Sequence, residues 1–157
     1  MNGPRVRTDI VDVYVIRADQ LLMLRRSREP LLGQWHPIMG HVEAGERAIE
    51  TALRELREEI ALGPSHIESW YQLEQTFPFF LADRDEVHLS PRFVVIAHET
   101  FEPVLNDEHN AHKWVGLDES ELLWPGQRHA LREIVSCILP GGPTAEALRL
   151  PTPGESA

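Results

Sequence analysis

The sequence has almost no cysteine and no long apolar run, and both absences limit what the protein can be. Its single cysteine, Cys137, excludes a disulfide within the chain, and it stands in an apolar stretch with helical spacing, where we expect a core residue rather than a nucleophile. The N-terminus lacks the apolar region of a secretory signal, and no stretch reaches the roughly 18 apolar residues of a membrane-spanning helix. We therefore expect a cytoplasmic protein with no membrane partner.

Positive charge is also scarce. The chain has 15 basic and 25 acidic residues among 157, which gives a formal net charge of −10. Binding to nucleic acid relies on neutralising phosphates with lysine and arginine, so this balance argues against a nucleic-acid partner. The sequence has no Gly-rich phosphate-binding loop that leads into a helix. A polyphosphate substrate would be repelled unless metal ions screened the acidic groups.

The stretch from Gly40 to Leu62 is the most informative part of the chain. Its apolar residues recur at helical spacing and fall on one side of a helix: Ile49, Ala52, Leu53, Leu56 and Ile60. Glu55, Glu58 and Glu59 share a face beside this side, where like charges repel. A divalent cation, which prefers oxygen ligands, would reverse that repulsion. The alternative is an ordinary solvated helix face, because runs of charge are usually on the surface.

This stretch resembles the Nudix box, the signature of the Nudix hydrolase family. The signature is a glycine, five residues, a glutamate, seven residues, Arg-Glu, an aliphatic residue, any residue, Glu-Glu, any residue, a glycine and an aliphatic residue. The chain matches it at Gly40, Glu46, Arg54, Glu55, Leu56, Glu58, Glu59 and Leu62. It departs once, with Ala61 where the family has glycine. Because alanine disfavours positive φ, Gly63, which precedes Pro64, is the residue we expect to end the helix.

Outside the box, the sequence patterns predict an α/β domain. Ile10–Arg17 and Leu21–Arg26 are rich in β-branched and aliphatic residues, which predicts two strands joined by a tight turn. Apolar residues at helical spacing within Gln127–Leu139 predict a terminal helix, and a short helix is expected at 117–122. Residues 140–157 are rich in proline and glycine, so we expect a flexible tail after a domain of residues 1–139.

The resemblance implies the Nudix α/β/α sandwich, a mixed β-sheet between the box helix and the C-terminal helix. It also implies a bound Mg²⁺, with Mn²⁺ as the alternative. A second segment, with Glu108-His109 and Lys113-Trp114, resembles the part of dihydroneopterin triphosphate pyrophosphohydrolases in which a loop glutamate faces the box helix. By this resemblance the metal ligands are the carbonyl oxygen of Gly40 and the carboxylates of Glu55, Glu58, Glu59 and Glu108.

The resemblance also assigns roles to single residues. The four metal-binding glutamates are the expected catalytic residues, and three of them remain candidates for the general base: Glu55, Glu59 and Glu108. Arg54 and Glu46 would pair to hold the loop against the helix. Arg26 and Trp35 are expected to contact the substrate, although a solvated loop position is an equal alternative for Arg26. His36 and His41 have no partner at zinc-site spacing, so we expect neither to bind metal.

Three functions fit the sequence. The first is metal-dependent hydrolysis of a diphosphate linkage in a nucleoside or pterin triphosphate, giving the monophosphate and pyrophosphate. The second is a Nudix hydrolase of nucleotide sugars or dinucleoside polyphosphates. The third is a catalytically silent Nudix module used for binding, which normally lacks box glutamates that this chain has. Family members are often dimers, so a homodimer is an open expectation.

Overall fold

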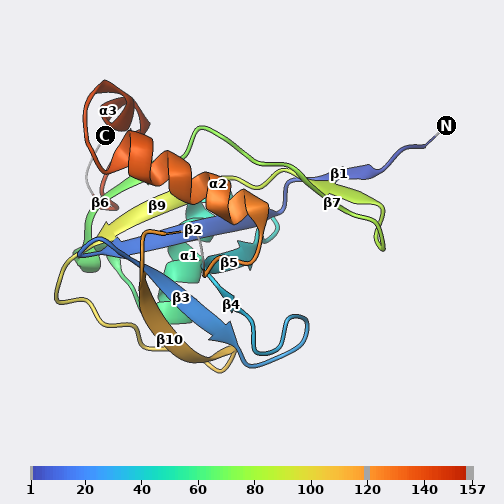
Figure 1. Cartoon of the computed structure of the whole chain (residues 1–157), viewed down its shortest axis with the longest axis horizontal. Coiled ribbons are helices and arrows are strands. Elements are labelled where there is room, and N and C mark those ends of the chain that lie inside the picture. The colour runs from blue at the N-terminus through green and yellow to red at the C-terminus, as the bar shows by residue number, and fades with distance from the viewer. Residues whose placement is uncertain (1, 119–120, 155–157) are drawn as a thin grey trace.

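The computed structural model describes residues 2–118 and 121–154 and shows a mixed β-sheet between two helices (Figure 1). The strand order in this sheet is β10-β3-β2-β9-β6-β11, with β5 also pairing with β2 and β4 with β3. Its strands are β2 (Ile10–Arg17), β3 (Gln20–Arg26), β4 (Trp35–His36), β5 (Ile38–His41), β6 (Ile67–Gln72), β9 (Arg92–Ala97), β10 (His109–Gly116) and β11 (Arg149–Leu150). β2 and β9 run parallel, and the other pairs are antiparallel.

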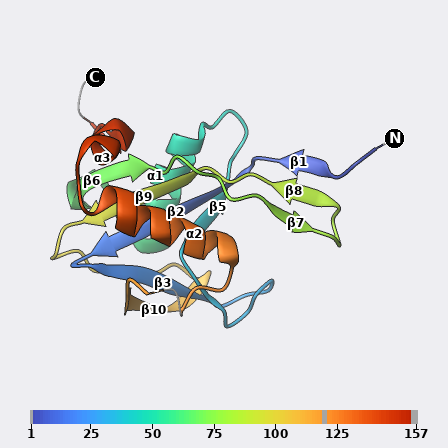
Figure 2. The ribbon, with the colours of Figure 1, turned by 45° about the horizontal axis from the view of Figure 1, so that its top comes forward.

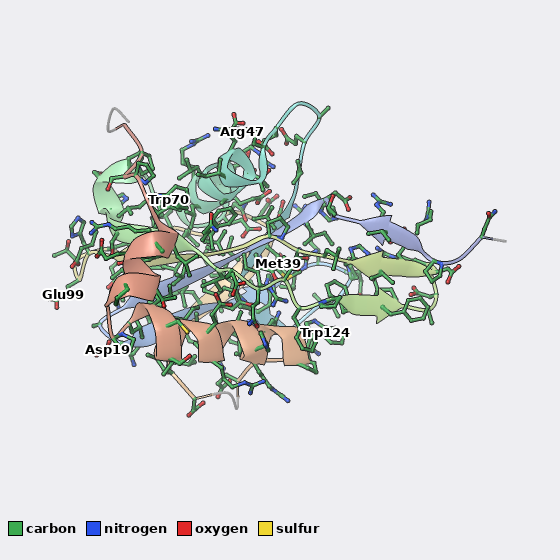
Figure 3. All side chains as sticks on the ribbon, turned by 90° about the horizontal axis from the view of Figure 1, so that it is seen from above. Asp19, Met39, Arg47, Trp70, Glu99 and Trp124 are labelled. Carbon is green, nitrogen blue, oxygen red and sulfur yellow. The ribbon has the colours of Figure 1, made fainter. Side chains whose placement is uncertain are left out.

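One helix covers each face of the sheet. The box helix is α1 (Ala48–Ile60), and the terminal helix is α2 (Pro125–Glu133), which continues as a π-helical segment (Ile134–Ile138). Figure 3 shows Arg47, at the start of α1, and Trp124, at the start of α2, on opposite sides of the sheet. The expected α/β/α sandwich is therefore confirmed.

The alternation of side chains along β2 explains why both faces are covered. Val11, Val13 and Val15 lie in the core cluster that α1 completes, whereas Tyr14 and Ile16 lie in the cluster that α2 completes. Successive residues of a strand point to opposite faces, so an unbroken apolar run produces a sheet that is buried on both sides. This arrangement fixes α1, and with it the box glutamates, against β2 and β5.

The end of α1 differs from the expectation. Ala61 itself adopts the left-handed conformation, with φ 56° and ψ 35°. Its backbone N–H donates to the carbonyl of Arg57, and that of Leu62 donates to the carbonyl of Leu56, which closes the helix end. The prediction that Gly63 ends the helix was therefore wrong. Hydrogen bonding and the burial of Leu62 hold alanine in a conformation that glycine would adopt with less strain.

A second, smaller sheet projects from the body of the molecule (Figures 1 and 2). It consists of β1 (Arg5–Arg7), β8 (Glu86–His88) and β7 (Phe79–Leu81), in that order. β7 and β8 are the distal part of the long hairpin whose proximal part is β6 and β9. An ion pair of 2.7 Å between Arg5 and Glu86 joins the N-terminal strand to the hairpin.

The segment after Leu139 is not a tail outside the fold. It forms α3 (Pro143–Leu148) and then β11, which pairs with β6. Trp70 Nε1 donates to the Pro151 carbonyl at 2.7 Å, and Ala145 is buried. The expectation of a flexible tail therefore does not hold for residues 143–150, and its last part, 155–157, lies outside the described residues. The expected short helix at 117–122 includes residues 119 and 120, which also lie outside them.

Within the described part of the chain, no helix combines the length and the apolarity needed to cross a bilayer.

Candidate active site

A cavity of about 460 Å³ lies between α1, β5 and the loop that follows β3. Six residues that the sequence assigns to the site line it: Arg26, Gly40, Glu55, Glu58, Glu59 and Glu108. They come from four separate parts of the chain, and the sheet brings them together. β3 supplies Arg26, β5 supplies Gly40, α1 supplies the three box glutamates, and the turn before β10 supplies Glu108.

Trp35 is not among the residues that line this cavity. It packs at the edge of the apolar cluster on the α2 face, with Lys113 Nζ 4.2 Å from the centre of its ring. The next residue, His36, does line the cavity, since neighbouring residues of a strand point to opposite faces. The geometry therefore gives the expected role of Trp35 in substrate binding no support, and it brings His36 to the site instead.

The glycine at position 40 is explained by its contact with Glu55. A Cβ atom at this position would lie 2.2 Å from Cδ of Glu55, closer than real Cβ contacts allow. Any side chain here would displace the Glu55 carboxylate from the cavity wall. The first glycine of the box motif thus makes room for the first glutamate of its Glu-x-x-Glu-Glu run.

Arg54 neutralises the glutamates at one end of the site. Its guanidinium contacts Glu46 at 2.8 Å, Glu55 at 2.8 Å and Glu58 at 3.2 Å, and it donates to the carbonyl of His41. Hydrogen bonds from Arg54 and Thr51 lower the pKa of Glu46 to about 2. The predicted pairing of Arg54 with Glu46 is confirmed.

Glu59 has a different environment. Its side chain is buried, and its Oε2 atom has no hydrogen-bond partner within the described residues. Burial, followed by the nearby charges of Glu55 and Glu108, raises its pKa from 4.5 to about 9, although Arg26 opposes the shift. The site therefore holds a carboxyl group that is protonated at neutral pH unless a cation replaces the proton.

Three side-chain atoms that can bind a metal ion lie close together around Glu59. A carboxylate oxygen of Glu59, one of Glu108 and a ring nitrogen of His109 all lie within 4.8 Å of one another. This set fits a divalent cation, because it offers two carboxylate oxygen atoms and one imidazole nitrogen atom. In addition, Oε2 of Glu59 is buried and has no hydrogen-bond partner within the described residues. The sequence predicts a functional role for Glu108, but nothing in it distinguishes His109 from a solvated loop residue.

Comparison with known proteins agrees with this fold and this site. A family model described as the NUDIX domain matches residues 6–134, so the chain belongs to the NUDIX domain family. Its fold is that of solved Nudix hydrolases. A curated relative, bis(5'-nucleosyl)-tetraphosphatase [asymmetrical] of Mus musculus, is 33% identical over 97 residues. The match covers 55% of this chain and 58% of that protein, so the chain spans less than two thirds of this relative's length.

Solved structures share the fold over most of their length. A MutT NUDIX hydrolase from Burkholderia pseudomallei is 27% identical, with a TM-score of 0.64 and coverage of 85% of this chain and 99% of that chain. The E. coli dihydroneopterin triphosphate pyrophosphohydrolase is 22% identical, with a TM-score of 0.69 and coverage of 86% and 98%. At this identity the second similarity concerns the fold alone.

Proposed function

We propose that the protein hydrolyses a diphosphate linkage in a nucleoside or pterin triphosphate and releases the monophosphate and pyrophosphate, with Mg²⁺ or Mn²⁺ bound at the site. One observation carries this proposal. Glu55, Glu58, Glu59 and Glu108 line one cavity. Among the described residues, Arg54 forms ion pairs with the first two of them and with none of the other two. The chain therefore leaves room for positive charge at the place where a polyphosphate would enter.

We assign the residues at the cavity to three roles: cation binding, phosphate binding and proton transfer. Glu55, Glu58, Glu59, Glu108 and the Gly40 carbonyl would hold the cation, which supplies charge neutralisation and lowers the pKa of a bound water. Arg26 lines the same cavity and is suited to a phosphate oxygen. A carboxylate that is not fully engaged with the cation, among Glu55, Glu59 and Glu108, would take the proton of the attacking water.

A second candidate is hydrolysis of dinucleoside polyphosphates. The curated relative from Mus musculus bears that activity in its name, and its match is the specific observation that favours this candidate. Nucleotide sugars remain an alternative with no such observation in their favour. A silent binding module is the third candidate, and the presence of Glu55, Glu58, Glu59 and Glu108 at the cavity argues against it.

The products distinguish these candidates. The protein would be incubated with Mg²⁺ and, in separate reactions, with ATP, dGTP, dihydroneopterin triphosphate, a nucleotide sugar and diadenosine tetraphosphate. We expect pyrophosphate from the triphosphates, detected as phosphate only after pyrophosphatase is added. Faster cleavage of diadenosine tetraphosphate into unequal nucleotides would favour the second candidate. Absence of hydrolysis of every compound with Mg²⁺ or Mn²⁺ would favour the third candidate, the silent binding module.

The position of attack is tested in ¹⁸O-labelled water. Label found in pyrophosphate places the attack on the β-phosphorus, and label found in the monophosphate places it on the α-phosphorus. Either result agrees with pyrophosphate release. Orthophosphate as the main direct product would contradict the proposed reaction.

A further inference from the structure

His109, the first residue of β10, is a buried histidine with one unused nitrogen atom. The residue is 3% exposed. Its Nε2 atom lies 3.1 Å from Nε2 of His36, and its Nδ1 atom has no hydrogen-bond partner within the described residues. A buried ring nitrogen without a partner is costly unless something else binds it.

The hydrogen bonds of the pair determine which nitrogen carries a proton. Nδ1 of His36 contacts the carbonyl oxygen of Pro37, which can only accept, so this nitrogen must donate. A hydrogen bond between the two Nε2 atoms needs one of them to accept, and the His36 ring, which already donates through Nδ1, offers its Nε2 atom as the acceptor. Nε2 of His36 therefore accepts, and Nε2 of His109 donates to it. Nδ1 of His109 is then left with a free lone pair.

We propose that Nδ1 of His109 binds the divalent cation of this site together with the carboxylates of Glu59 and Glu108. The proposal rests on the proposed function only for the presence of a cation. Two ligand atoms at about 2.1 Å from one ion can be up to about 4.2 Å apart, whereas the ligand atoms of these three residues lie within 4.8 Å of one another. Adjacent ligand atoms around an octahedral ion are about 3.0 Å apart, so an approach of at most about 2 Å between any two of these atoms is sufficient to form the site.

A nitrogen ligand changes which metal the site prefers. Mg²⁺ favours oxygen ligands, and imidazole favours first-row transition metals. The site should therefore bind Mn²⁺ more tightly than Mg²⁺, and the histidine should account for most of the difference. His36 would act as a positioning residue, because its hydrogen bond fixes the His109 ring and the nitrogen that faces the metal.

Pulsed electron paramagnetic resonance of the full chain with one equivalent of Mn²⁺ tests the proposal directly. We expect a coupling from a directly bound ¹⁴N nucleus that changes to ¹⁵N when only histidine is ¹⁵N-labelled. The coupling should disappear in His109→Gln and remain in His41→Gln, since His41 also lines the cavity but is exposed. No bound nitrogen in the wild type, or a coupling that survives in a folded His109→Gln variant, would overturn the assignment.

Calorimetry with Mn²⁺ or Mg²⁺ alone gives a second readout. His109→Gln should weaken Mn²⁺ binding by about 10-fold or more and Mg²⁺ binding by less than about 3-fold. Equal weakening of both metals would show that the histidine only supports the fold. These measurements do not depend on hydrolysis: nitrogen coupling without turnover would defeat the proposed function alone, and turnover without nitrogen coupling would defeat this inference alone.

Discussion

The two ends of the carboxylate cluster on α1 differ in how their charge is balanced. At one end Glu46, Glu55 and Glu58 all contact the guanidinium of Arg54. At the other end Glu59 is buried beside Glu108, and one of its oxygen atoms has no partner within the described residues. The chain thus supplies a directly paired cation at the Arg54 end. At the Glu59 end Arg26 is close enough to oppose the rise in the pKa of Glu59, but its guanidinium donates to the carbonyls of Glu29 and Pro30. The difference shows that glutamates of one cluster can differ in how far the protein's own arginines balance their charge.

The largest effect on turnover is expected from the glutamates that line the cavity, at either end of the cluster. Glu59→Gln should lower turnover by about 10² or more, a size typical of losing one element of electrostatic stabilisation, while the fold survives. Glu55→Gln should cause a similar loss, because this residue faces both the cavity and Arg54. Steady-state kinetics with Mg²⁺ measures both variants.

The matched control for these variants is Glu50→Gln. Glu50 lies on the same helix but pairs with exposed Arg47 outside the cavity, so turnover should stay within about twofold. Near wild-type turnover in a folded Glu59→Gln variant would show that the unbalanced charge at Glu59 is not needed for activity.

At the Arg54 end of the cluster, the largest expected effect of a substitution is on the free energy of unfolding. Arg54→Met should lower the free energy of unfolding by about 3 kcal/mol, because it leaves the partly buried Glu55 without its cation. Urea denaturation without metal measures this loss. Arg47→Met removes an exposed ion pair and should leave the urea midpoint nearly unchanged. Equal losses in the two variants would mean that the Arg54 network contributes no more than a surface pair.

Truncation after Leu139 tests whether a distant region affects stability without affecting the metal site. It removes α3, β11 and the hydrogen bond to Trp70, and it exposes apolar surface against which Leu148 and Leu150 pack. We expect a loss of about 2–3 kcal/mol from this exposure. Thermal denaturation with and without Mg²⁺ should give the same metal-induced shift as the full chain. A smaller shift would mean that the C-terminal segment also supports the site.

The pH dependence of stability provides a finer test of Glu59. Its pKa is higher in the folded state, about 9 against 4.5, so its contribution is fully present below pH 4.5 and is lost as pH rises towards 9. In the absence of metal, Glu59→Gln should therefore melt at least about 5 °C above the wild type at pH 8, and the difference should vanish near pH 4. Mg²⁺ should reduce the difference at pH 8. No dependence of the difference on pH would show that Glu59 is not buried as a neutral group.

The smallest effect is expected just beyond Glu59, where Ala61 ends the helix. Ala61→Gly removes the strain of a left-handed alanine but increases the freedom of the unfolded chain. The net gain should be about 0.5–1 kcal/mol, measured by urea denaturation. Turnover should be unchanged if Glu59 is already correctly placed. A clear gain in turnover would mean that the alanine displaces the Glu59 end of the cluster.

The sequence by itself determined the class of the protein, the box helix and the pairing of Arg54 with Glu46. These features are local: helical periodicity places the glutamates on one face, and a fixed spacing links Glu46 to Arg54. The two strands at 10–17 and 20–26 could also be predicted from the sequence, because strands buried on both faces appear as continuous runs of β-branched and aliphatic residues.

The tertiary structure alone decided the features that depend on residues distant in sequence. It buried Glu59 beside Glu108, placed Trp35 on the face away from the cavity, and brought His109 against His36. It also held the proline-rich C-terminal segment on β6. The local pattern of these residues is polar or irregular, and their positions are fixed by burial and by strand register, which no short stretch of sequence contains.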